Sequence, residues 1–181
     1  MSRKAPHQLL VMGVAGCGKS TLAAELARAL GCALIEGDDH HPALNQAKMR
    51  AGIALDDANR APWLAQLGTL LAGANAGAVL TCSALKRRYR EQLRAVAPAL
   101  AIVFIDISPA QAHARVAART DHLFPPGLVD SQFEALESPL GEAGVLRVEA
   151  TQPLPEQLDA ILRWLGHPVH QTAHPTEENL S

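Results

Sequence analysis

Residues 13–20 of the chain read GVAGCGKS. They follow an apolar run, residues 8–12 (QLLVM), and lead into residues 19–30, where leucine recurs at every fourth position. The apolar run predicts a short buried strand, and the fourfold spacing predicts a helix. A loop of the form G-x-x-x-x-G-K-[ST] between a strand and a helix is typical of a phosphate-binding loop, or P-loop. This stretch therefore predicts both the start of an α/β fold and an anion site at its centre.

The loop is expected to hold the phosphates of a nucleoside triphosphate, with ATP favoured. Successive backbone N–H groups form a nest for anions, and the following helix adds partial positive charge. We expect Lys19 to contact the terminal phosphates and act in catalysis, and Ser20 to ligate Mg²⁺. The alternative, a glycine-rich turn without a ligand, is disfavoured by the complete motif. The expected nucleotide-binding residues here are Gly13, Val14, Ala15, Gly16, Cys17, Gly18, Lys19, Ser20 and Thr21.

The three cysteines, Cys17, Cys32 and Cys82, show no C-x-x-C spacing and no framework of pairs. Reduced thiols in a cytoplasmic protein are the simplest interpretation. Cys17 lies inside the glycine loop, where a helix N-terminus favours a reactive thiolate. Its oxidation could block nucleotide binding, but we favour the alternative that it is a small residue that fits the loop.

Length and charge exclude several classes of protein. The chain has 181 residues, enough for one domain, and its formal net charge of -2 offers no general attraction to nucleic acid or to an anionic membrane. No apolar run reaches the ~18 to 20 residues that span a bilayer. The N-terminus lacks the apolar region of a secretory signal. Any basic site must therefore be local, and no nucleic-acid or membrane partner is expected.

Strands and helices alternate along the chain, which predicts a doubly wound parallel β-sheet with helices on both faces. We expect a single P-loop kinase domain over residues 1–166, a helical lid at about 115–140, and a disordered tail over 167–181. Further strands are expected at 33–36, 78–82, 100–107 and 145–148. Further helices are expected at 42–49, from Asp57 onward, from Ser83 to about 96, and at 109–119, 129–136 and 155–165, with Asp57, Ser83 and Ser108 as caps.

Acidic residues follow the second strand in the segment 36–42 (EGDDHHP). Ligands of such sheets bind beyond the carboxyl ends of the strands, so we expect this segment beside the glycine loop. Asp38 is expected to accept the proton of an attacking hydroxyl, and Glu36 to hold Mg²⁺ through water. A solvated loop is the alternative. A metal cluster is disfavoured because neighbouring side chains rarely converge on one ion.

Five cations follow the third strand: Lys86, Arg87, Arg88, Arg90 and Arg94. They could form a solvated helix face. Alternatively, Lys86, Arg87 or Arg90 binds an anionic acceptor, since an arginine fork matches the two oxygens of a carboxylate. A nucleic-acid patch is disfavoured because no aromatic residues are interleaved with these cations.

Arg115 and Arg119 share one face of the helix after the fourth strand, at positions i and i+4. There they could bind the nucleotide, neutralise the transferring phosphoryl group, and close the site against water. The alternative is two surface arginines. The chain has no N-K-x-D segment to read guanine, so a small-molecule kinase is favoured over a GTPase.

Segments that match a known family run in order from residue 13 to 139. Besides GVAGCGKS, the most specific are DDANRAPWL (56–64), CSALK (82–86) and SQFEALE (131–137). On these residues the chain resembles the gluconate kinases (gluconokinases), which are P-loop small-molecule kinases related to shikimate kinase.

The resemblance implies transfer of the ATP γ-phosphate to the 6-hydroxyl of D-gluconate by a cytoplasmic homodimer that needs Mg²⁺. Asp38 would meet the 6-hydroxyl, while Arg119 would act in catalysis and His122 on the substrate from the lid. The residues implied to read the hydroxyls and carboxylate are His41, Arg60, Lys86 and Arg90. A P-loop kinase for shikimate or another sugar acid, an NTPase switch and a non-catalytic nucleotide-binding module remain alternatives.

Overall fold

One parallel sheet forms the centre of the structure, a computed structural model that describes residues 7–118 and 125–167. Within these residues the five strands pair in the order β2-β3-β1-β4-β5, every pair parallel. The strands are β1 (Gln8–Met12), β2 (Ala33–Glu36), β3 (Ala78–Thr81), β4 (Ala101–Asp106) and β5 (Val145–Glu149). All carboxyl ends therefore lie at one edge, where a ligand site is expected.

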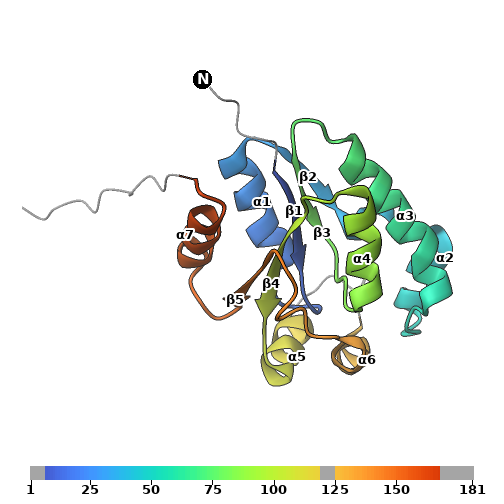
Figure 1. Cartoon of the computed structure of the whole chain (residues 1–181). Helices are drawn as coiled ribbons and strands as arrows, with labels where there is room; N and C mark the ends of the chain where they lie inside the picture. Colours follow the sequence, from blue (N-terminus) through green and yellow to red (C-terminus); the bar gives the residue numbers. More distant parts are fainter. Residues whose placement is uncertain (1–6, 119–124, 168–181) are drawn as a thin grey trace, which may run out of the picture.

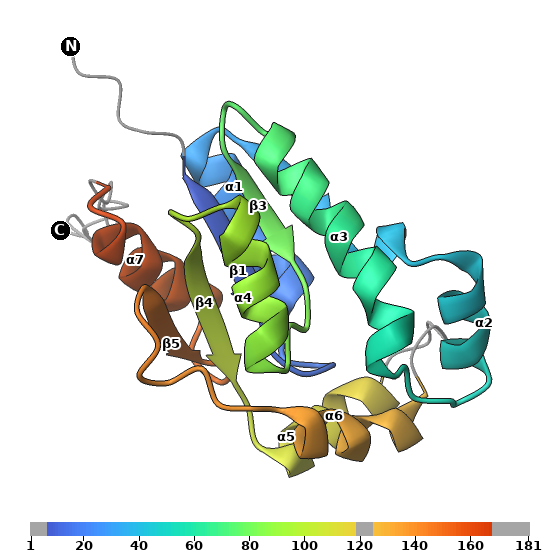
Figure 2. The same ribbon diagram turned by 45° about the vertical axis from the view of Figure 1, so that its right-hand side comes forward.

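Helices cover both faces of the sheet, as Figure 1 shows, with α1 and α7 on one face and α3 and α4 on the other. Two helices, α5 and α6, lie beyond the carboxyl ends of the strands (Figures 1 and 2). The doubly wound prediction is thus confirmed. The helices are α1 (Lys19–Leu30), α2 (Ala43–Arg50), α3 (Asp57–Gly73), α4 (Arg87–Val96), α5 (Pro109–Ala117), α6 (Val129–Ala135) and α7 (Leu154–Trp164), with short 3-10 turns η1 (Gly37–His40) and η2 (Pro126–Leu128).

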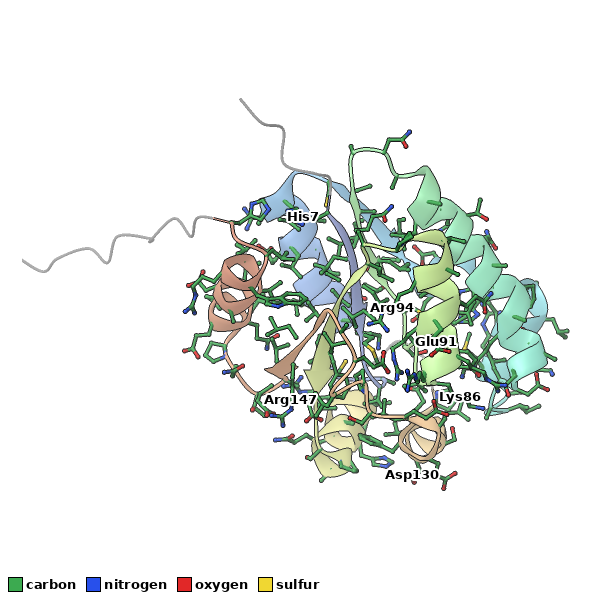
Figure 3. All side chains as sticks on the ribbon, in the orientation of Figure 1. His7, Lys86, Glu91, Arg94, Asp130 and Arg147 are labelled. Carbon is green, nitrogen blue, oxygen red and sulfur yellow. The ribbon has the colours of Figure 1, made fainter. Side chains whose placement is uncertain are left out.

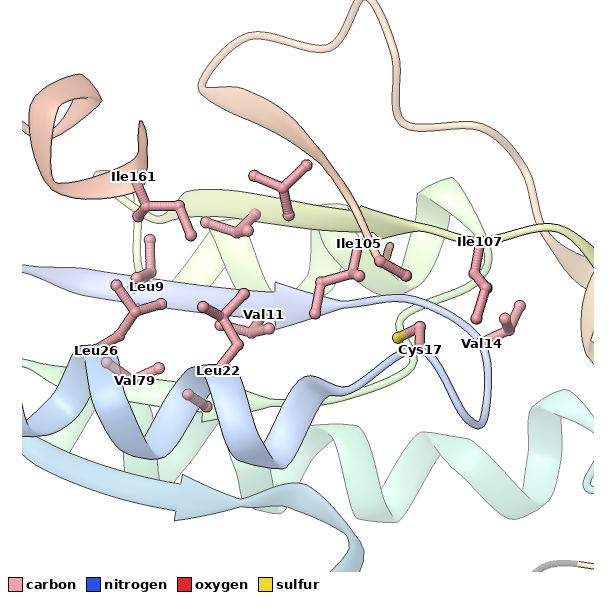
Figure 4. Packing of buried hydrophobic residues seen from close by; sticks show 14 of the residues in the cluster. Leu9, Val11, Val14, Cys17, Leu22, Leu26, Val79, Ile105, Ile107 and Ile161 are labelled. Atoms are coloured by element: carbon pink, nitrogen blue, oxygen red, sulfur yellow. The ribbon is translucent and has the colours of Figure 1, made fainter. Parts of the chain in front are cut away.

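Two apolar clusters hold these layers together. Because successive side chains of a strand point to opposite faces, Leu9 and Val11 of β1 face α1 and α7, where they pack near Leu26 (Figure 4). Leu10 and Met12 pack on the other face against α3 and α4. The strand is buried on both sides, which explains why its sequence is apolar throughout.

Most predicted elements agree with the structure to within two residues. Ser108 caps α5 as predicted, accepting a hydrogen bond from the backbone N–H of Gln111. The cap of α3 is Asp56 rather than Asp57: its carboxylate accepts from the N–H of Asn59 at 2.7 Å, and the Asn59 side chain completes a capping box.

The predicted cap at Ser83 is wrong, because α4 begins only at Arg87. Ala84 adopts a left-handed conformation with φ 45°, which interrupts any helix that starts earlier. The carbonyls of Ala84 and Leu85 instead accept hydrogen bonds from the Arg90 guanidinium, at 2.9 and 3.1 Å. A side chain farther along the chain therefore fixes the turn between β3 and α4.

No helix in the two described ranges is long and apolar enough to cross a membrane. The predicted lid (about 115–140) and the predicted disordered tail (167–181) lie partly or largely outside the described residues, so both stay predictions.

Arg90 forms a buried ion pair with Glu142. Its side chain is 0% exposed, and Nε donates to Glu142 Oε1 at 3.0 Å. Arg94, also on α4, donates to the other Glu142 oxygen at 2.7 Å. Burial raises the pKa of Glu142, but hydrogen bonds from Arg90 and Arg94 outweigh it and keep that pKa below its ordinary value. Together, Arg90 and Arg94 of α4 (Arg94 is labelled in Figure 3) hold Glu142 and thereby join α4 to the segment before β5.

Replacing Arg90 by Met should lower the free energy of unfolding by about 1.5–3 kcal/mol, because Glu142 would lose its charge-assisted hydrogen bonds from Arg90 and keep only Arg94 as a partner. Urea unfolding followed by circular dichroism measures this. Adding Glu142→Gln to Arg90→Met should recover part of the loss.

The matched control is Arg87→Gln, which breaks the exposed Arg87–Glu91 pair one turn earlier (68% and 56% exposed side chains). Its effect should stay within about 1 kcal/mol. Equal losses for Arg90→Met and Arg87→Gln would contradict the structural role of the buried pair.

Candidate nucleotide and acceptor site

The glycine loop joins β1 to α1 at the carboxyl edge of the sheet. Gly13 has φ 145°, and a Cβ there would lie 2.8 Å from the backbone oxygen of Ile105, so only glycine fits. Lys19 folds over the loop, with Nζ donating to the oxygens of Gly13 and Val14 at 3.1 Å each. The expected nucleotide-binding residues 13–21 thus lie together, in the loop and the first turn of α1.

The Cys17 side chain lies in the apolar core underneath this loop, where a Cβ on Gly13 would be 2.8 Å from its Sγ. Its side chain is 2% exposed and packs in the cluster that includes Val14 and Ile105 (Figure 4). This placement favours the interpretation that a small residue is needed for packing.

Glu36 lies against Ser20, as a shared magnesium site requires. Ser20 Oγ donates to Glu36 Oε2 at 3.0 Å, and the Thr81 hydroxyl donates to the same oxygen at 2.7 Å. Although β3 separates β2 from β1, the side chains meet across it. Hydroxyl and carboxylate oxygens are ligands that Mg²⁺ accepts. No group of three or more His, Cys, Asp or Glu in the described ranges is placed to hold a metal, so phosphate or water would have to complete the shell.

Asp38 extends from η1, directly after β2, with 84% of its side chain exposed. The preceding residue is fixed: Gly37 N–H donates to the Thr81 hydroxyl at 3.1 Å, and the indole of Trp63 donates to Gly37 O at 2.8 Å. A Cβ at position 37 would lie 2.1 Å from Thr81 O, so no side chain fits. A rigid turn therefore presents the Asp38 carboxylate.

His41 is buried beside this carboxylate. Its ring stacks on Trp63 with centroids 3.9 Å apart, and its Nε2 lies 3.8 Å from Asp38 Oδ1. Burial lowers the pKa of His41 to about 4; Asp38 acts in the opposite direction and Arg60 in the same direction. The ring is therefore uncharged at neutral pH, and it can bind a hydroxyl without adding charge.

A small cavity of about 80 Å³ opens between α3, α4 and α6, and its polar lining includes Arg60, Lys86, Tyr89, Ser131 and Gln132. Two predicted substrate residues, Arg60 and Lys86, thus line one cavity. Lys86 lies at the start of α4 above α6 (Figure 3), and its Nζ donates to Asp57 Oδ1 at 3.0 Å. The cavity offers two cations to an anionic acceptor.

Gln132 of α6 connects this cavity with the glycine loop, because its Oε1 accepts the backbone N–H of Ala15 at 2.7 Å. Sequence reasoning gave Gln132 no role. Its only signal was its place in the SQFEALE segment, since the two residues lie 117 positions apart.

Arg115 lies at the glycine loop, where backbone oxygens take its hydrogen bonds; its binding of a nucleotide stays a prediction. One guanidinium nitrogen lies 3.4 Å from the oxygens of Gly16 and Cys17, and the other donates to Ala150 O at 2.8 Å. Arg119 and His122 lie outside the described residues, so their roles stay predictions.

Arg90 is not brought to this site. Its side chain is 0% exposed, and four of its five N–H groups donate to Glu142 and two backbone oxygens, so it is committed to the β3–α4 turn and to Glu142. It borders a separate cavity of about 780 Å³ that contains no residue of the glycine loop. Arg87 pairs with Glu91 at 2.9 Å on the surface. Of the three cations considered for the acceptor, only Lys86 lines the small cavity.

The chain is similar to known proteins along most of its length. The family model described as "AAA domain" matches residues 9–139. A gluconokinase of Gluconobacter oxydans is 44% identical over 87% of this chain and 90% of its own length.

Two solved structures share the fold. A gluconokinase from Sinorhizobium meliloti superposes with a TM-score of 0.79 at 42% identity, covering 91% of this chain and 98% of that one. A sugar kinase from a Janibacter species superposes with a TM-score of 0.83 at 34% identity, covering 89% of this chain and 95% of that one. With a P-loop at the sheet edge and relatives that match it nearly end to end, this chain belongs to the gluconokinase family of P-loop kinases.

Proposed function

We propose that the protein is an ATP-dependent gluconokinase that transfers the γ-phosphate of ATP to the 6-hydroxyl of D-gluconate, giving 6-phospho-D-gluconate and ADP. One observation carries the mechanism: the glycine loop, the Asp38 carboxylate and a cavity with two cations lie around the carboxyl edge of one sheet. Such an edge brings a phosphate donor and a sugar-acid acceptor together in line for transfer.

The nucleotide side of the site neutralises charge. The loop amides and Lys19 would hold the β- and γ-phosphates of ATP. Ser20 and Glu36 fit as ligands of Mg²⁺, which when bound would neutralise charge that develops on the phosphate oxygens. Arg115 would support the loop backbone from α5.

The acceptor side positions a hydroxyl and a carboxylate. Asp38 would take the proton of the 6-hydroxyl as that oxygen attacks phosphorus, and His41 would bind hydroxyls beside it. Arg60 and Lys86 would bind the carboxylate in the cavity. Arg119 and His122 would act in a lid. A homodimer in the cytoplasm remains our prediction for the assembly and its location.

A coupled assay of ADP release tests the proposal. The purified chain with ATP and Mg²⁺ should turn over rapidly with D-gluconate and only slowly with shikimate, other sugar acids or no acceptor. Faster turnover with another acid would mean that this acid, and not gluconate, is the substrate. ADP release that is independent of any acceptor would indicate an NTPase, and ATP binding without turnover would indicate a binding module.

Asp38→Asn should lower kcat by about 10²- to 10⁴-fold, because the amide cannot take the hydroxyl proton. Steady-state kinetics measures this, and nucleotide binding followed by calorimetry should be unchanged. The control is Asp39→Asn, the same change at the exposed neighbouring residue. A near-normal kcat for Asp38→Asn would refute its role as the base.

Arg60→Met should raise the KM for gluconate by about 10- to 100-fold, the loss expected for a hydrogen bond to a charged group, and leave the KM for ATP unchanged. Arg88→Met is the matched control. Arg88 also lies near Tyr89, but its side chain is 55% exposed and does not line the cavity. If Arg60→Met raised only the KM for ATP, Arg60 would bind the nucleotide and not the acceptor.

A further inference from the structure

The buried ring of His41 has a polar neighbour on each side. Its Nδ1 lies 3.4 Å from the side-chain nitrogen of Asn45, and its Nε2 faces Asp38. Trp63 covers one face of the ring. A neutral imidazole carries its proton on one nitrogen only, and the partner on the other side decides which nitrogen that is.

The orientation of the Asn45 amide is fixed from outside the pair. Its Nδ2 lies 2.8 Å from the backbone oxygen of Asn59, and that oxygen can only accept. If the amide were turned over, its Oδ1 would lie 2.8 Å from the backbone oxygen of Asn59, and neither oxygen could donate. Asn45 is only 2% exposed, so such an unsatisfied contact would be costly. The Asn45 atom near His41 is therefore the NH₂ group, a donor.

His41 must then accept at Nδ1 and carry its proton on Nε2. This neutral form agrees with the low pKa of the ring. Burial lowers that pKa most, Asp38 of η1 raises it, and Arg60 of α3 lowers it further. The protonated Nε2 lies 3.8 Å from Asp38 Oδ1, which is too far for a direct hydrogen bond. A hydroxyl oxygen can lie about 3 Å from both atoms, within the reach that a base and its substrate need.

We propose that Asn45 is a positioning residue for phosphoryl transfer: it holds His41 in the Nε2–H form, so that the ring donates to the acceptor hydroxyl while Asp38 accepts that hydroxyl's proton. The catalytic consequence rests on the proposed function, but the form of the ring does not. His41 then acts as a neutral donor that turns the hydroxyl toward the base, and it takes no proton itself.

Nuclear magnetic resonance of the full chain with ¹⁵N-labelled histidine tests the form of the ring directly. Two-bond ¹H–¹⁵N spectra, with the His41 signals assigned by their loss in His41→Gln, should show a protonated Nε2 and a bare Nδ1. The signals should not titrate between pH 5.5 and 8.5. A protonated Nδ1, or titration within this range, would overturn the proposal without reference to any substrate.

Asn45→Asp tests the consequence. Its carboxylate can only accept, so it loses the hydrogen bond to the Asn59 oxygen and should turn toward His41 Nδ1. There it should draw a proton onto Nδ1, change the ¹⁵N pattern, and bring the titration of the ring into the range from pH 5.5 to 8.5. In the neutral Nδ1–H form, Nε2 no longer donates. We expect kcat with gluconate to fall about tenfold or more at pH 8, with partial recovery at lower pH as the ring gains a second proton, and the KM for ATP to stay unchanged.

Gln46→Glu is the matched control, because it makes the same amide-to-acid change one residue later. Gln46 donates to the backbone oxygen of His41 at 3.0 Å and not to its ring. It should keep the ¹⁵N pattern and a kcat within about twofold. Equal losses in both variants, or an Asn45→Asp pH profile parallel to the parent's, would reject the role of Asn45. Should the parent not phosphorylate gluconate, the proposed function fails while the spectra still decide the form of the ring.

Discussion

The hydroxyl of Thr81, at the end of β3, joins the parts from which the site is built. It accepts the N–H of Gly37 and donates to Glu36, and Glu36 accepts from Ser20 of α1. One buried hydroxyl thus fixes the end of β2, the turn that carries Asp38, and the helix behind the glycine loop relative to one another. Chemistry that needs a base and a metal ligand within a few ångströms depends on this small network, since backbone pairing alone leaves side chains free to move.

The fold could be predicted because its signals are local. The apolar run 8–12, the glycine loop and the helix after it are read within one stretch, and alternating strands and helices allow few topologies. Ser83 failed as a cap because the competing interaction, from Arg90 to the Ala84 and Leu85 carbonyls, is set by tertiary structure. The sequence could not show that Asp56 rather than Asp57 caps α3, because two adjacent aspartates give nearly the same local signal.

The site could be predicted only in part. Lys86 and Arg90 lie four residues apart on one basic segment, and nothing in that segment shows that Lys86 lines a cavity while Arg90 meets Glu142 across 52 positions. The contact of Gln132 with Ala15 is equally long-range, so no spacing rule could find it. Ser20 and Glu36, which the sequence assigned to one site, do lie together, because they stand at the ends of elements that the fold brings to the same edge of the sheet.

The buried pair of Arg90 and Glu142 also limits how this chain can drift. Loss of Glu142 leaves the buried Arg90 guanidinium without its carboxylate, and loss of Arg90 leaves Glu142 paired with Arg94 alone, whereas replacing both Arg90 and Glu142 by apolar groups can be nearly neutral. A variant that has lost only one of the two residues is therefore less stable than the parent, and selection removes it before the second substitution arises. Descendants of this sequence should inherit the two residues together, and a lineage that has lost one should carry a compensating change in the turn between β3 and α4 or in the segment before β5.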